Sequence, residues 1–124
     1  MPQGQGETIL VVEDDPQVLG TCQAMLERLG YRVLTATSGS QALEVCDQHE
    51  EVALVLMDLV LPEMSGAELF QSLRSRDPEV RVVAMTGYPL EEDGRGLLEQ
   101  GIVDWMQKPL DFARLAEVVS QALR

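Results

Sequence analysis

The hydrophobic and polar positions of the chain form two alternating kinds of segment. Short runs rich in Val, Leu and Ile have no polar face, which is typical of strands buried inside a parallel sheet. Between them lie segments in which apolar side chains recur every three or four residues, the period of an amphipathic helix. The predicted strands cover residues 8–12, 32–36, 54–62, 80–85 and 102–107.

Helix starts are marked by local signals. Pro16 suits the first position of a helix, because proline lacks the N–H that would be unpaired there. Ser38 with Gln41, and Ser65 with Glu68, follow the capping-box pattern, in which two side chains satisfy backbone N–H groups at a helix start. The predicted helices begin at or near Pro16, Ser38, Ser65, Leu90 and Asp111.

Five strands that alternate with five helices predict an α/β fold, a doubly wound five-stranded parallel sheet. We expect the flavodoxin-like strand order 2-1-3-4-5. The length of 124 residues matches one domain. We predict that residues 7–124 form this domain and that residues 1–6, rich in Gly and Gln, are a flexible leader or a linker remnant.

The charge of the chain excludes several classes of partner. A net charge of −12, from 21 acidic residues against 9 Lys and Arg, repels a phosphate backbone and an anionic membrane. We therefore expect no direct nucleic-acid binding. No apolar run is long enough to span a bilayer, and the N-terminus lacks the features of a signal peptide, so we expect no membrane insertion and a cytoplasmic location.

The cysteines and the single histidine indicate no further chemistry. Cys22 and Cys46 lie in separate apolar helical patterns without the spacing of a metal site. His49 lies among acidic residues near a helix end, and its isolation excludes a Ser-His-Asp hydrolase.

Polar residues interrupt the apolar pattern mainly where strands end. Asp14 and Asp15 follow the first strand, Asp58 ends the third, Thr86 the fourth and Lys108 the fifth. The carboxyl ends of parallel strands share one edge of the sheet, so these side chains should converge. Several carboxylates beside one lysine suit Mg²⁺, which prefers hard oxygen ligands. With such a cation bound, Asp58 could act as a nucleophile toward a phosphoryl group.

From Thr8 to Leu123 the chain resembles the receiver domains of two-component response regulators. The resemblance rests on the signatures Glu13-Asp14-Asp15, Met57-Asp58-x-x-x-Pro62-x-Met64-x-Gly66, Thr86-Gly87 and Asp104-Trp105-x-x-Lys108-Pro109. It implies that Asp58 is the phosphoacceptor and that Asp14, Asp15, Asp58 and the backbone carbonyl of Val60 hold Mg²⁺. It further implies that Thr86 and Lys108 contact the phosphoryl group and that the Lys108–Pro109 bond is cis.

The same resemblance gives roles to three neighbours of the site. Thr86 and Trp105 occupy the positions of the family's switch pair. The family usually has Tyr or Phe in place of Trp105, so a switch and a ring packed over the helix of residues 90–100 both stay open. Val60 and Tyr88 occupy positions that tune loss of the phosphoryl group. Neither offers a carboxylate or an amide to orient water, so slow dephosphorylation is expected.

The resemblance implies a histidine kinase or a histidine phosphotransfer protein as the phosphodonor. Residues 6–12 and 86–109 look like the C-terminal receivers of hybrid sensor histidine kinases, so the chain is either part of such a kinase or a stand-alone response regulator. Its enzymatic activity would be limited to its own phosphorylation and slow dephosphorylation, and dimerisation on phosphorylation is left open.

Other functions fit the sequence less well. A flavodoxin-like cofactor binder needs a Ser/Thr/Gly-rich loop after the first strand, where this chain has three acids. A phosphatase of the haloacid dehalogenase type needs a second acid at the position of Val60. The remaining alternative is a non-phosphorylated interaction module with a receiver fold. The presence of the complete set of acids together with Thr86 and Lys108 argues against it.

Overall fold

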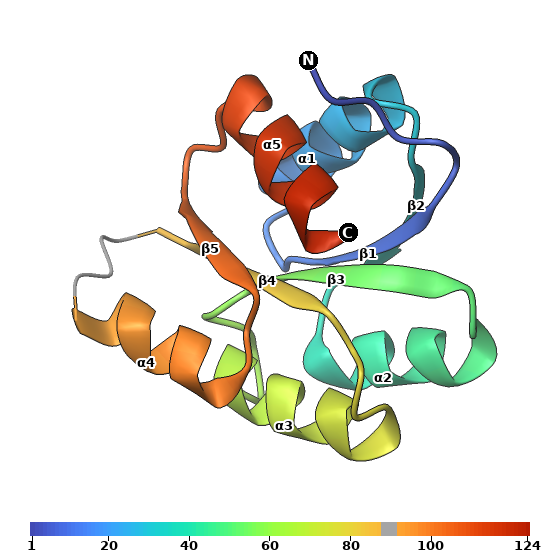
Figure 1. The fold of residues 1–124 in the computed structure, drawn as a ribbon. Helices are drawn as coiled ribbons and strands as arrows, with labels where there is room; N and C mark the ends of the chain where they lie inside the picture. The colour runs from blue at the N-terminus through green and yellow to red at the C-terminus, as the bar shows by residue number, and fades with distance from the viewer. Residues whose placement is uncertain (88–91) are drawn as a thin grey trace.

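The computed structural model describes residues 1–87 and 92–124 of the chain. Strands and helices alternate along it (Figure 1). The elements are β1 Thr8–Val12, α1 Pro16–Arg28, β2 Arg32–Ala36, α2 Gly39–Gln48, β3 Val52–Asp58, α3 Gly66–Arg76, β4 Val82–Thr86, α4 Glu92–Gln100, β5 Asp104–Gln107 and α5 Phe112–Ala122. No helix in the described ranges is long and apolar enough to cross a bilayer.

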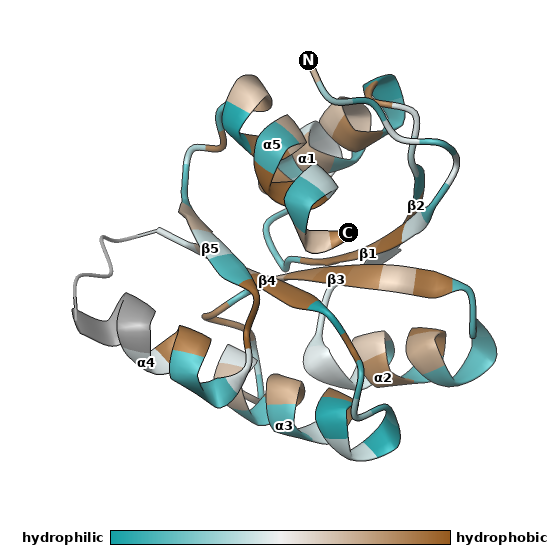
Figure 2. Cartoon of the chain, in the orientation of Figure 1, coloured by the Kyte–Doolittle hydropathy of each residue, from teal (hydrophilic) through white to brown (hydrophobic). Residues whose placement is uncertain are grey.

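The strands form one parallel sheet in the order β2-β1-β3-β4-β5, which confirms the predicted fold. Helices α1 and α5 cover one face, and α2, α3 and α4 cover the other (Figure 1). Each face therefore has its own apolar core, and the three central strands β1, β3 and β4 are largely hydrophobic (Figure 2). Burial on both faces is the reason that the strand sequences lack alternation.

The predicted helix starts are those observed, except that the start near Leu90 lies outside the described residues. Ser65 forms the full capping box with Glu68. Ser38 also accepts a hydrogen bond from the Gln41 backbone N–H, but the Gln41 side chain accepts from Thr37 instead of returning to Ser38.

The N-terminal residues are hydrogen-bonded to the body of the domain. The N–H of Gly4 donates to the carbonyl of Leu29, and that of Gly6 donates to the carbonyl of Gly30 at 2.9 Å. The boundary between a leader of residues 1–6 and a domain of residues 7–124 stays a prediction.

The central strand is shorter at its carboxyl end than the predicted stretch 54–62. β3 ends at Asp58, and residues 59–65 form a loop, the β3–α3 loop. Two residues of this loop, Leu59 and Leu61, are apolar although the strand has ended, because they pack against the core on the side of α2 and α3. An apolar run therefore continues past the strand end, and hydrophobicity alone could not show where the strand stops.

The β3–α3 loop contains a residue in the left-handed conformation, Glu63, with φ +70°. This conformation costs a residue with a Cβ about 1–2 kcal/mol, whereas glycine adopts it without that penalty. Glycine loses more conformational entropy on folding, which offsets part of this advantage. We therefore expect the free energy of unfolding of Glu63→Gly to exceed that of Glu63→Ala by about 0.5–1 kcal/mol. Both changes remove the same charge. Urea unfolding of the two variants measures the difference, and equal stabilities would contradict the argument.

Candidate functional site

Of the polar residues predicted to converge, all but Asp15 gather at the carboxyl edge of the sheet. Asp58 is the last residue of β3, Thr86 is the last residue of β4, and Lys108 directly follows β5. The strand order places these ends beside the end of β1, after which Glu13 and Asp14 follow. Four segments far apart in the chain thus build one site.

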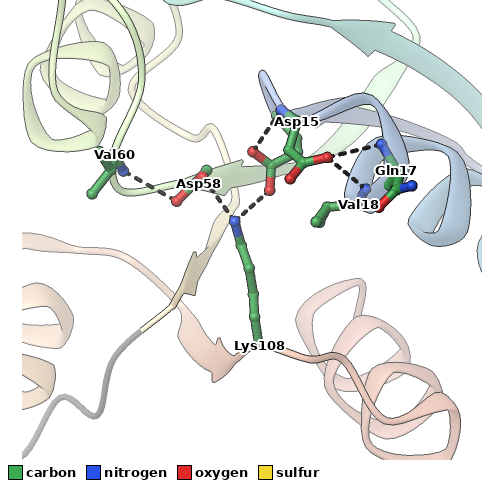
Figure 3. Close-up of polar contacts among 7 residues, drawn as sticks. Asp15, Gln17, Val18, Asp58, Val60 and Lys108 are labelled. Atoms are coloured by element: carbon green, nitrogen blue, oxygen red, sulfur yellow. Dashed lines mark hydrogen bonds and ion pairs between the residues drawn. The ribbon is translucent and has the colours of Figure 1, made fainter.

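Lys108 joins two carboxylates at this site (Figure 3). Its Nζ donates a hydrogen bond to Asp58 Oδ2 at 2.8 Å and another to Glu13 Oε1. The exposed fraction is 18% for the Lys108 side chain, 8% for Asp58 and 1% for Glu13. Burial disfavours the ammonium charge, but the two carboxylates outweigh burial and raise the pKa of Lys108. The lysine is therefore held in its charged form between two buried acids.

The backbone also contributes to this arrangement. The N–H of Lys108 donates to the carbonyl of Thr86 at 2.7 Å, which ties the ends of β4 and β5 together. The N–H of Val60 donates to Asp58 Oδ1 at 3.1 Å. Each oxygen of Asp58 therefore has a donor, and the carboxylate is fixed in orientation.

Glu13, Asp14 and Asp58 form an acidic cluster, in which one oxygen from each residue lies within 4.8 Å of the others. Glu13 and Asp58 are buried, whereas Asp14 is exposed. Three carboxylates with one lysine leave an excess of negative charge, and hard oxygen ligands suit a divalent cation. The exposed side of the cluster would let such a cation keep part of its water shell. The donor set therefore fits a hard divalent cation.

Asp15 has a different task, because it caps α1. Its Oδ1 accepts hydrogen bonds from the N–H groups of Gln17, at 2.9 Å, and Val18, at 3.4 Å (Figure 3). Asp is among the preferred residues for this position. The local sequence contained the signal, because a proline at position 16 starts the helix and makes the preceding residue its cap.

The acidic cluster differs from the pocket expected from the sequence. The assignment of Asp14 and Asp15 as Mg²⁺ ligands stays a prediction, whereas the cluster in the structure contains Glu13 and Asp14. Sequence analysis had not assigned Glu13 a role in the cluster. Its buried contact with Lys108 joins residues 95 positions apart, and no local pattern reports such a contact.

Burial raises the pKa of the Glu13 carboxyl from 4.5 to about 7, and the hydrogen bond from Lys108 offsets this only in part. The folded state therefore binds more protons than the unfolded chain between these two pH values. The stability that protonation of Glu13 contributes is fully present below the pKa of this carboxyl in the unfolded chain. It is lost as the pH rises through the pKa of the carboxyl in the folded domain. We expect the metal-free domain to lose stability over this window, measured by urea unfolding with a chelator. A decline of equal size in Glu13→Gln would contradict this origin.

The other predicted site residues differ in their environment. Thr86 is buried, and the Val60 side chain is 60% exposed. Trp105, in β5, is half-buried and packs against the same core as Leu97 of α4. Tyr88 lies outside the described residues. The Lys108–Pro109 peptide bond is cis, as the resemblance implied.

Comparisons with known proteins agree with this geometry. Residues 9–120 match the family model of the response regulator receiver domain. The transcriptional regulatory protein ZraR of Klebsiella oxytoca is 38% identical over 97% of this chain, which spans 27% of that protein. The sensor kinase CckA of Brucella abortus is 35% identical over 94% of this chain, which spans 12% of that protein.

A solved structure shows the same fold with a bound ligand. The response regulator TrrA of Thermotoga maritima, determined in complex with Mg²⁺–BeF, has a TM-score of 0.83 and 27% identity, covering 94% of this chain and 99% of its own. The family match extends over most of the chain, including every residue of the acidic cluster and Lys108. This chain therefore belongs to the family of response regulator receiver domains.

Proposed function

We propose that this domain accepts a phosphoryl group on Asp58 in a reaction that requires Mg²⁺. The observation that carries the proposal is the position of Asp58, a buried carboxylate inside the acidic cluster whose two oxygens are held by Lys108 and by the Val60 N–H. The similarity to TrrA, whose structure contains Mg²⁺ and BeF, supports this choice of cation.

The chemistry follows from the groups at hand. An Asp58 oxygen attacks the phosphorus of a phosphohistidine, a P–O bond forms as the P–N bond breaks, and the electron pair of the broken bond returns to the imidazole nitrogen. Lys108, whose Nζ donates to Asp58 Oδ2, would contact the oxygens of the incoming phosphoryl group. Thr86, at the end of β4, would donate its hydroxyl to another of these oxygens. Bound Mg²⁺, held by Asp14, Asp58 and the Val60 carbonyl, with Glu13 beside them, would neutralise phosphoryl charge.

The proposed phosphodonor is a histidine kinase or a histidine phosphotransfer protein. The relatives include both a transcriptional regulator and a sensor kinase, so the similarity supports a receiver module in either setting. Membership of a hybrid sensor kinase and dimerisation on phosphorylation stay predictions. The net charge of −12 supports output through protein contacts rather than direct binding of nucleic acid.

Intact mass spectrometry after incubation with Mg²⁺ and phosphoramidate, a small donor with a P–N bond, tests the proposal. We expect the mass of one phosphoryl group to be gained by the wild type and not by Asp58→Asn or in the presence of a chelator. Absence of any gain would favour the non-phosphorylated interaction module.

The same signal reports the lifetime of the phosphoryl group after the donor is removed. The exposed Val60 side chain has no group to orient water, so we expect slow loss and a faster loss in Val60→Asn, which supplies an amide. Loss within seconds in the wild type would contradict this prediction.

A further inference from the structure

The first residue of α2, Gly39, leaves a notch that the side chain of Met64 fills. A Cβ added to Gly39 would lie 2.6 Å from Met64 Cγ and 3.2 Å from Cε, and closer still to the sulfur. Gly39 is buried and does not have a positive φ, so an added side chain there would push on Met64 without straining the backbone. The contact joins the start of α2 to the β3–α3 loop.

The base of the β3–α3 loop is fixed independently of this contact. The N–H of Gly66 donates to the carbonyl of Leu59 at 2.9 Å, and Val60 pairs with Ser65 in an isolated antiparallel bridge. A Cβ on Gly66 would approach the Leu59 Cα to 2.8 Å, so the chain passes closely there. Near its tip, the loop is held against α2 by Met64.

The loop carries Val60, whose N–H donates to the phosphoacceptor and whose carbonyl is a proposed ligand of the cation. Loss of a group that hydrogen-bonds to a metal ligand and orients it lowers metal affinity about 10–100-fold. A packing contact that orients the loop bearing the ligand acts on the same geometry. The Met64 contact links this loop to the start of α2.

We propose that Met64 is a positioning residue, whose insertion into the Gly39 notch holds the β3–α3 loop in the geometry that binds the cation and orients Asp58. The proposal rests on the proposed Mg²⁺-dependent phosphorylation. Met64 and Gly39 touch neither the cation nor the phosphoryl group. A side chain that only filled the core would affect unfolding and leave cation affinity unchanged.

The test compares Gly39→Ala with Gly20→Ala, a matched change in a helix where an added Cβ meets no atom within 4 Å. For each variant, calorimetry gives the Mg²⁺ affinity, and phosphorylation by phosphoramidate gives the Mg²⁺ concentration for half-maximal rate. We expect Gly39→Ala to raise both the dissociation constant and the half-maximal concentration about tenfold. The rate at saturating Mg²⁺ should recover, and Gly20→Ala should match the wild type.

Met64→Ala and the double variant Gly39→Ala/Met64→Ala complete the test. Met64→Ala should weaken Mg²⁺ binding as Gly39→Ala does, and the double variant should be less impaired than the product of the two single effects, because both remove the same contact. Reduced stability with unchanged Mg²⁺ affinity, or independent effects of the two changes, would overturn the role of Met64. A wild type that neither binds Mg²⁺ nor takes up phosphate would overturn the proposed function itself, and this inference with it.

Discussion

Replacement of Lys108 by methionine is expected to lower the free energy of unfolding of the metal-free domain by about 3 kcal/mol, the size of effect seen when one partner of a buried ion pair is removed. Lys108 donates to both Glu13 and Asp58, and these two side chains are almost fully buried. Without the lysine, two neighbouring carboxylates lose their counter-ion and must repel each other or take up a proton. Urea unfolding in the presence of a chelator measures the loss.

Two controls separate charge from packing in this prediction. Lys108→Arg keeps the positive charge and should retain most of the stability. Addition of Mg²⁺ should reduce the deficit of Lys108→Met, because a cation bound by the same carboxylates supplies the missing charge and stabilises the folded state by mass action. Unchanged stability of Lys108→Met under chelation would show that the observed contacts carry no net energy.

Asp14→Asn is expected to weaken Mg²⁺ binding at least about tenfold, about 1.4 kcal/mol, whereas Asp15→Asn should leave it close to the wild-type value. Asp14 belongs to the acidic cluster, and Asp15 caps α1. Each change removes one negative charge from neighbouring positions, so the long-range electrostatic effect is nearly the same. Asparagine caps a helix as well as aspartate does, so the second variant keeps its fold.

Calorimetric titration with Mg²⁺ compares the two variants directly. Equal weakening by both would indicate that charge alone matters, and a larger effect of Asp15→Asn would restore the assignment made from the sequence. Asp15→Ala serves as a further control. It should lose about 1 kcal/mol of stability through the missing cap, with little change in Mg²⁺ affinity.

Much of the site could be predicted because its signals are local. Asp58, Thr86 and Lys108 each interrupt or follow an apolar run, and a polar residue there must lie where the strand meets solvent or a partner. The alternation of strands and helices then placed these ends at one edge. Helix starts were equally local, since Ser65 and Glu68 satisfy backbone N–H groups within one helical turn.

Other features depended on contacts between distant segments. Hydrophobicity could not show that β3 stops at Asp58, because Leu59 and Leu61 are half-buried against the core in the loop that follows. The contact between Gly39 and Met64 could not be predicted either, because nothing in the sequence around one residue indicates that it packs against the other.

Hydrophobic period and helix capping act over a few residues, so the amino-acid sequence was enough to predict the kinds of element, their order and the edge of the sheet at which the chemistry lies. Which of the three consecutive acids face the site became visible only in the folded arrangement. Glu13 turns toward Lys108 and Asp15 toward the N–H groups of α1. The direction of a side chain just past a strand depends on the turn that follows and on partners brought there by the sheet, and neither is encoded in the identity of the acid.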